Sequence, residues 1–149
     1  MSADRIVTRA QWRTLYWELL RAAPRTVSGN RKQTQILVGI IRQGSGEMRR
    51  VIHAGEAAAA QYQRGCNTLG FLKLARELGS VERQVVASLL KTHAERALAE
   101  RRTSRAPESV ESLTYDGFDR AVAGLARDLD IVIPKYKPSV SLEWIPERQ

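Results

Sequence analysis

The chain has 149 residues, of which 43% are hydrophobic, and it carries a formal net charge of +8. This amount of apolar material suits one modest core, and the absence of any run of about 18 apolar residues argues against a transmembrane helix. The single cysteine, Cys66, excludes an internal disulfide and favours a reducing compartment, while His53 and His93 stand too far apart to suggest a metal site.

The positive charge is concentrated in the first third of the chain. Residues 1–50 contain ten Lys or Arg and three Asp or Glu, whereas residues 51–149 contain fourteen and thirteen. Such local basicity predicts an acidic partner, either an acidic protein or a nucleic acid, although a solvated basic surface gives the same pattern. An arginine-rich, acid-poor N-terminus is also typical of mitochondrial import signals. Because its first helix carries a core face, we expect this segment to be retained.

The first predicted helix begins at Thr8 and carries one apolar face. Thr8 and Gln11 have the spacing of a capping box. Pro24 is expected to end the helix, because proline disfavours helical geometry at the residue before it. The apolar face combines residues three and four apart, namely Trp12, Leu15, Tyr16, Leu19, Leu20 and Ala23. The opposite face carries a row of residues four apart that points outward, namely Arg9, Arg13, Trp17 and Arg21.

Two further helices are predicted before residue 78. The turn Ser28-Gly29-Asn30 can cap the second helix, whose apolar face includes Ile36 and Ile40, and Gly44-Ser45-Gly46 predicts its end. A third helix is expected over residues 45–78. Its small residues, Gly55, Ala57 to Ala60 and Gly65, suit close helix packing or a slender apolar ligand, and close packing is the more frequent case.

The rest of the chain is predicted to be helical, followed by an extended tail. Gly79 indicates the end of a helix and Ser80 the N-cap of the next one. This fourth helix is expected to reach residue 102, and it is followed by a linker over 103–113 and a fifth helix after Thr114. The tail contains Pro134, Pro138 and Pro146 among large apolar residues, which favours an extended strap. The predicted fold is all-α, comprising a three-helix antiparallel bundle (1–78), additional C-terminal helices packed on it (79–130) and the extended tail (131–149).

No residue pattern in the sequence supports catalysis. We find no phosphate-binding glycine loop, no nucleophile elbow and no cluster of metal ligands. Cys66 falls on the apolar stripe of the third helix, where a buried thiol is more common than a nucleophile. We therefore expect a protein without enzymatic activity.

The segment Leu15 to Ala23, with the sequence LYWELLRAA, resembles the opening helix of the LYR-motif family of mitochondrial adaptor proteins. The basic first two helices add to the resemblance, and residues 62–72, with the sequence YQRGCNTLGFL, are similar to the family's third helix. Together these features cover residues 8–78, about half of the chain. Trp17 departs from the family pattern, which usually has arginine at this third motif position.

The resemblance implies a three-helix bundle that binds mitochondrial acyl carrier protein and takes the carrier's acyl-4'-phosphopantetheine arm into its core. Such a bundle would be an accessory subunit or assembly factor of a larger complex in the mitochondrial matrix, either a respiratory complex or the mitochondrial ribosome. The expected acyl channel comprises Leu15, Tyr16, Leu19, Ile36, Ile40, Ala58, Ala59 and Tyr62. The residues expected to meet the carrier's acidic face, chosen by charge and location, are Arg13, Trp17, Arg21, Arg31, Lys32, Arg49 and Arg50.

The basic composition also suits a different function. A mitochondrial ribosome-associated protein that contacts RNA directly, without an acyl carrier, would share the isoelectric point near 10.2 and the arginine-rich N-terminal half. The absence of a recognisable RNA-binding module argues against this alternative. A scaffold with no ligand is the third interpretation.

Overall fold

The computed structural model describes residues 7–52, 58–102 and 111–136, and the regular structure in these ranges is entirely helical. This confirms the predicted all-α class. The described helices are α1 (Arg9–Thr26), α2 (Arg31–Ile52), α3 (Ala58–Leu74), α4 (Val81–Arg102) and α5 (Glu111–Asp128). Three predicted features lie outside the described residues, namely the small residues Gly55 and Ala57, the linker around Pro107, and the tail beyond residue 136.

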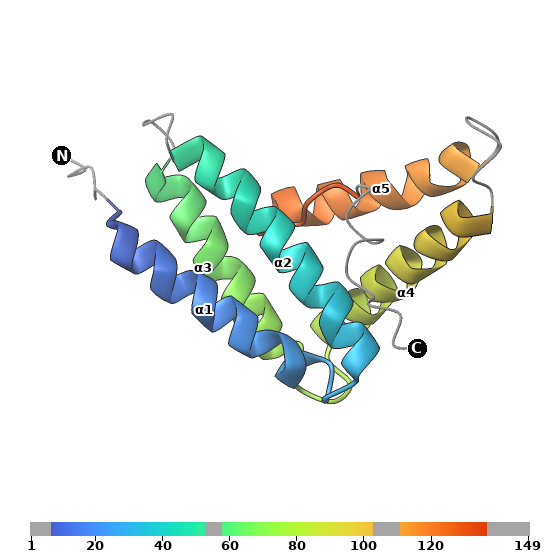
Figure 1. The fold of residues 1–149 in the computed structure, drawn as a ribbon, viewed down its shortest axis with the longest axis horizontal. Coiled ribbons are helices and arrows are strands. Elements are labelled where there is room, and N and C mark those ends of the chain that lie inside the picture. Colours follow the sequence, from blue (N-terminus) through green and yellow to red (C-terminus); the bar gives the residue numbers. More distant parts are fainter. Residues whose placement is uncertain (1–6, 53–57, 103–110, 137–149) are drawn as a thin grey trace, which may run out of the picture.

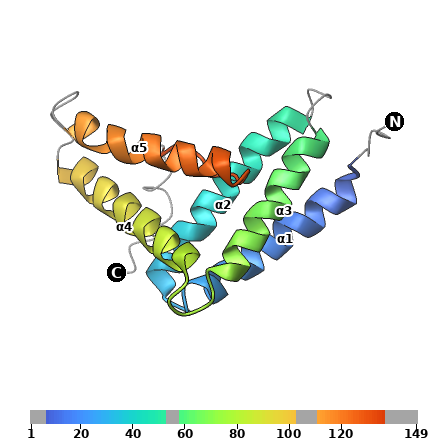
Figure 2. The same cartoon turned by 180° about the vertical axis from the view of Figure 1, so that it is seen from behind.

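The helices form two arms that meet at one corner (Figures 1 and 2). In the first arm α1, α2 and α3 run side by side in alternating directions, and each packs on the other two. α4 starts at the corner, packs on α2 and α3, and leads away along the second arm. α5 runs back from the far end of α4 toward the first arm.

The start of α1 agrees with the prediction, but its end does not. The Gln11 backbone N–H donates to Thr8 Oγ1 at 3.2 Å and the Thr8 N–H donates to Gln11 Oε1 at 2.8 Å, which completes the capping box. The prediction that Pro24 ends the helix is wrong, because α1 continues to Thr26. Thr26 is only 2% exposed and its hydroxyl donates to the Leu72 carbonyl of α3 at 3.1 Å. This packing outweighs the one backbone hydrogen bond that proline removes.

The second and third helices are divided at a different place from the predicted one. α2 runs without interruption through Gly44-Ser45-Gly46, so the predicted break at these residues is wrong. The expected single helix over residues 45–78 is wrong for the same reason, since α2 ends at Ile52 and α3 occupies only Ala58–Leu74. The turn before α2 does form, and Asn30 Oδ1 caps the helix by accepting from the Gln33 backbone N–H at 3.2 Å.

The glycines inside α2 lie where other parts of the chain approach the helix or leave it open. A Cβ atom on Gly44 would lie 3.3 Å from Val132 Cγ1, so this glycine lets the segment after α5 lie against the helix. A Cβ atom on Gly46 would meet nothing within 4 Å. A glycine in a helix interior costs about 1 kcal/mol relative to alanine, and at Gly44 the contact with Val132 accounts for that cost.

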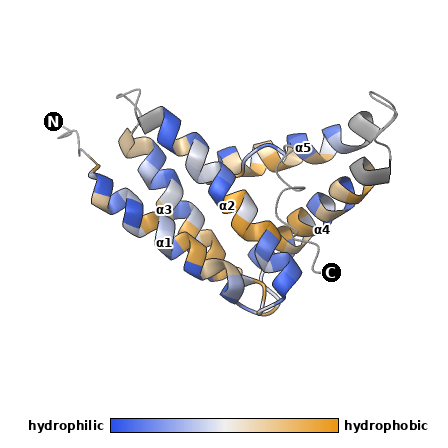
Figure 3. Cartoon of the chain, in the orientation of Figure 1, coloured by the Kyte–Doolittle hydropathy of each residue, from blue (hydrophilic) through white to orange (hydrophobic). Residues whose placement is uncertain are grey.

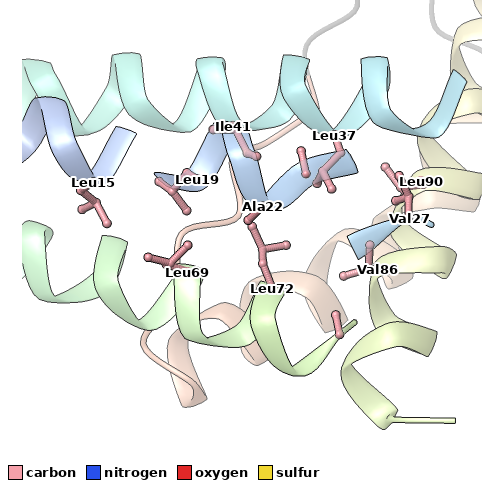
Figure 4. Close-up of a cluster of buried hydrophobic side chains, with 12 residues drawn as sticks. Leu15, Leu19, Ala22, Val27, Leu37, Ile41, Leu69, Leu72, Val86 and Leu90 are labelled. Carbon is pink, nitrogen blue, oxygen red and sulfur yellow. The ribbon is translucent and has the colours of Figure 1, made fainter. Parts of the chain in front are cut away.

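One hydrophobic core joins the first four helices (Figure 4). Leu15 and Leu19 of α1 point toward Leu69 and Leu72 of α3, and burial of one such leucine contributes roughly 1.5–3 kcal/mol. The second and fourth helices add buried side chains to the same cluster, namely Leu37, Ile41, Val86 and Leu90. α4 therefore shares the core of the first arm.

Gly65 sets the close contact between α1 and α3, and its replacement should be costly. A Cβ atom at this position would lie 2.7 Å from Leu15 Cδ2, and Leu15 is itself fixed by burial. Gly70, in the same helix, is exposed and would accept a Cβ atom without a neighbour within 4 Å. We expect Gly65→Ala to be less stable to urea than Gly70→Ala by about 1–3 kcal/mol, because both gain helix propensity and only the first is overpacked. Equal free energies of unfolding would contradict this account of the α1–α3 contact.

The C-terminal elements begin and end largely as predicted. Ser80 Oγ accepts from the Arg83 backbone N–H at 3.2 Å, which confirms the new cap. The predicted stop at Gly79 is misplaced, because α3 already ends at Leu74 and Gly79, with a φ of +79°, lies in the turn that follows. α5 begins at Glu111, slightly earlier than the predicted start after Thr114. After α5 the chain continues without regular structure over residues 131–136.

The 131–136 segment is fixed against α2 and α3. The Val132 backbone N–H donates to Thr68 Oγ1 of α3 at 2.9 Å, and Gln43 Nε2 of α2 donates to the Lys135 carbonyl at 2.6 Å. The described start of the tail, residues 131–136, therefore lies on the helices without regular structure.

Candidate functional site

A basic groove separates the N-terminal half of α1 from the C-terminal half of α2. The groove encloses about 910 Å³, and its lining residues include no Asp or Glu. Figure 3 shows that many residues in these parts of the two helices are hydrophilic. The rim is formed by exposed arginines from both helices, Arg9, Arg13, Arg42 and Arg49. Their combined charge attracts anions, and the planar guanidinium groups suit phosphate and carboxylate ligands.

The floor and sides of the basic groove are apolar. Leu15, Leu19 and Met48 are buried at its floor, and Gly46 leaves the α2 side open. Trp17 of α1 is 53% exposed at the side, and its ring lies 6.0 Å from the ring of Tyr16. A ligand that combines an anionic group with an apolar part would match this arrangement of charge and surface.

Two buried polar atoms in the groove lining have no hydrogen-bond partner among the described residues. They are Trp12 Nε1, an obligate donor, and Ser45 Oγ. Trp12 is held in place by an edge-to-face contact with Tyr62 of α3, with ring centroids 5.5 Å apart. Because buried polar atoms are normally satisfied, these two are available to a bound group that carries hydrogen-bond acceptors.

An apolar chamber of about 410 Å³ lies on the other side of α2. Its walls come from α2, α3, α4, α5 and the 131–136 segment. Most of its lining is hydrophobic, including Leu37, Ile40, Phe71, Leu89, Phe118 and Val122. This volume falls within the range of small-molecule sites, which is about 300–1,000 Å³.

A buried guanidinium group at the chamber wall is paired through one of its nitrogens, while its Nε has no hydrogen-bond partner among the described residues. Arg96 is 8% exposed, and its Nη2 donates to Asp119 Oδ1 at 2.7 Å. The rings of Tyr115 and Tyr136 also cover the guanidinium carbon, at 4.2 Å and 5.0 Å from their centroids. The positive charge of Arg96 therefore serves to hold α4, α5 and the 131–136 segment together.

His93 beside this cluster should make the stability depend on pH. Its ring packs edge-on against Tyr136 at 4.9 Å, and its pKa lies below the ordinary 6.5 because of burial first and the nearby Arg96 second. A histidine whose pKa is lowered by folding adds stability that is complete above its unfolded pKa and is lost as the pH falls through its folded pKa. We expect the urea midpoint to fall more between about pH 7.5 and pH 5 in the wild type than in His93→Phe. An identical fall in both proteins would show that His93 does not contribute.

The basic groove and the chamber meet inside the first arm. Leu19, Ser45 and Met48 line both hollows, so these three side chains lie between them. Ser45 is the middle residue of the Gly44-Ser45-Gly46 sequence in α2. Gly46 leaves open space on the groove side of the helix, whereas at Gly44, on the chamber side, Val132 and Pro134 lie against the helix backbone.

The structure divides the predicted channel residues among the groove, the chamber and the packed helices. Leu15 and Tyr16 line the groove, Ile40 lines the chamber, and Leu19 lines both. The remaining four line neither hollow, since Ile36 and Tyr62 pack against the core while Ala58 and Ala59 lie at the start of α3. The half-buried Cys66 packs against the same core.

The predicted docking residues are likewise divided. Arg13, Trp17 and Arg49 line the basic groove. The other four, Arg21, Arg31, Lys32 and Arg50, do not, and Arg31 lies about 27 Å from Arg49 along α2 at the ordinary helical rise. Sequence reasoning missed Arg42 as a site residue. Its spacing of seven from Arg49 places both on one helix face, but only if α2 continues through its glycines.

Comparisons with protein-family models, with curated proteins and with solved structures find no match to this chain. In the part of the chain that the structure describes, no group of three His, Cys, Asp or Glu residues is placed to hold a metal ion. No helix within the same ranges is long and apolar enough to cross a membrane.

Proposed function

We propose that this chain is a non-catalytic, LYR-like mitochondrial adaptor that binds acylated acyl carrier protein at the basic groove. The observation that carries the proposal is the combination of four rim arginines, no lining acid and an apolar floor in one groove. An acidic carrier supplies the matching charge, and its acyl-phosphopantetheine arm supplies a phosphate, amide acceptors and an aliphatic chain. In the matrix the adaptor would attach the carrier to a respiratory complex or to the mitochondrial ribosome.

Co-expression with the carrier tests this proposal directly. The full chain and mitochondrial acyl carrier protein are produced together, purified through a tag on the chain, and weighed by intact mass spectrometry. We expect a stoichiometric carrier whose mass includes phosphopantetheine and a fatty acyl group. A chain that purifies without the carrier, although both proteins are soluble in the same cells, would contradict the proposal.

Gly46→Leu should block the groove without disturbing the fold. The new side chain enters space in which a Cβ atom meets nothing within 4 Å, and it replaces glycine by a strong helix former. Gly39→Leu is the matched control, because Gly39 lies in the same helix, has equally open space and lines neither hollow. We expect carrier capture to fall by about tenfold or more in Gly46→Leu and to be unchanged in Gly39→Leu. Equal capture by both variants would place the carrier elsewhere.

Direct RNA binding is the second candidate function. The observation that favours it is the exposed Trp17 beside Tyr16 on an arginine-rich groove, since bases stack on aromatic rings flanked by cations. A gel-shift titration with labelled ribosomal RNA fragments distinguishes the two. Tight RNA binding with a steep salt dependence, lost in Gly46→Leu and found without carrier capture, would favour this function over the adaptor.

A further inference from the structure

The contact between α1 and α3 leaves no space for a ligand chain inside the three-helix arm at this level. Leu15 is 3% exposed and fills the position opposite Gly65, where even one added Cβ atom would lie 2.7 Å from Leu15 Cδ2. A chain lying between these helices would have to separate them. An aliphatic group that enters the basic groove therefore needs another space.

The chamber is the apolar space next to the groove. Leu19, Ser45 and Met48 line both hollows, and the leucine and methionine side chains can change rotamer. Most of the chamber lining is hydrophobic, and its buried cation, Arg96, is paired with Asp119 at 2.7 Å, so this lining suits an aliphatic chain. The rim of the adjoining groove favours an anion. The two hollows together match a single-chain amphiphile with its charged head outside.

We infer that the chamber formed by α2, α3, α4, α5 and the 131–136 segment receives the aliphatic chain of an anionic amphiphile, whose head group lies among the groove arginines. Ser45 Oγ, buried between the hollows without a partner, is placed to donate to the carbonyl or carboxylate oxygen where head and chain join. The inference rests on the proposed function for the identity of the amphiphile as an acyl-phosphopantetheine. The chamber itself can be tested without the carrier.

One wall of the chamber, the 131–136 segment, is held in place by hydrogen bonds to α2 and α3. The 131–136 segment is hydrogen-bonded to Thr68 of α3 and to Gln43 of α2, at 2.9 Å and 2.6 Å. Ile131 is buried, and Tyr136 contacts both His93 and Arg96 of α4. The helices and tail beyond the first arm thus supply most of the space in which a chain would lie.

Binding of free fatty acids to the full chain tests the inference. Isothermal titration calorimetry is carried out with hexanoate, octanoate, decanoate and dodecanoate below their micelle concentrations. We expect the Kd to fall by about fourfold for each added methylene until the chamber is full, and then to level off. No binding, or a Kd independent of chain length, would overturn the inference.

The Leu89→Trp variant tests whether the size of the chamber sets the chain length at which the Kd levels off. Leu89 is a half-buried wall residue of α4, and a larger side chain there shortens the chamber, whereas Ala87→Trp adds the same ring to an exposed position outside it. We expect the Kd to level off at a shorter acid in Leu89→Trp and to follow the wild type in Ala87→Trp. Val122→Phe narrows the chamber from α5 and replaces Leu89→Trp if that variant does not fold. An unchanged series in the folded wall variants would overturn the inference.

Three further outcomes separate this inference from its alternatives. If Arg96→Met weakens binding while Arg49→Glu does not, the head group lies inside the chamber, and the stated orientation is wrong. If fatty acids bind with the expected series but the carrier is not captured on co-expression, the proposed function fails and the chamber assignment stands. If the carrier is captured but the Kd for fatty acids does not depend on chain length, the chamber assignment fails and the proposed function stands.

Discussion

Replacing Leu15 by aspartate is expected to unfold the first arm. Leu15 is 3% exposed, faces Leu69 across the α1–α3 contact, and packs directly over Gly65. Loss of the leucine alone should cost about 2–5 kcal/mol, and a carboxylate without a partner in the core adds to that cost. Since small domains are stable by only about 5–15 kcal/mol, most of the population should lose its helical circular dichroism or its cooperative urea transition.

Trp17→Asp is the control from the neighbouring motif position. Trp17 is 53% exposed, so the same aspartate there should cost much less than in the core, about 1–2 kcal/mol. The pair shows that the first and third motif positions have different roles. Leu15 supports the core and Trp17 belongs to the groove, so loss of carrier binding in Leu15→Asp would report unfolding. A cooperative, near-wild-type transition in Leu15→Asp would contradict the core described here.

The helices themselves could be predicted from the sequence because their signals are local. The capping box of Thr8 and Gln11, the Asn30 cap and the Ser80 cap each depend on residues within one or two turns. Pro24 and the α2 glycines carry equally local signals that predict an end. Tertiary packing overrides them, through Thr26 in the first case and Val132 in the second.

The candidate site could be predicted only in part. The arginine row of α1 and the apolar face with Leu15 and Leu19 follow from helical spacing, and they gave the correct charge for one side of the groove. Arg42 was missed because the groove needs an unbroken α2. The chamber was missed because Ile131 to Tyr136 line it beside α2 and α3, and no local pattern places the tail there.

The two glycines of α2 explain why both hollows lie on this helix. Without side chains at Gly44 and Gly46, α2 presents its backbone to the chamber on one side and to the groove on the other. Alanine at Gly46 would stabilise the helix by about 1 kcal/mol but would partly fill the groove, whereas alanine at Gly44 would press against Val132. The two glycines therefore allow other groups to approach the backbone of α2, although glycine in a sequence usually indicates the end of a helix.

Reversal of two groove arginines should abolish carrier capture. Arg13 and Arg49 line opposite sides of the basic groove, one on α1 and one on α2, and both are exposed. In Arg13→Glu/Arg49→Glu two carboxylates face an acidic partner where two cations stood, and like-charge contacts across an interface cost several kcal/mol. We expect the affinity for acylated carrier to fall by about 100-fold or more, measured by titration calorimetry at low salt.

The matched control is Arg21→Glu/Arg31→Glu, which makes the same change in net charge outside the groove. Both residues are exposed and line neither hollow. Long-range attraction depends on net charge, so its reduction should weaken association modestly in both double variants. Salt should screen this long-range contribution equally in both. The two double variants differ only in whether the changed residues contact the carrier in the groove, so the control should lose no more than about tenfold in affinity. If the two double variants lose affinity equally, the carrier is attracted by the overall charge of the chain and the basic groove is not its binding site.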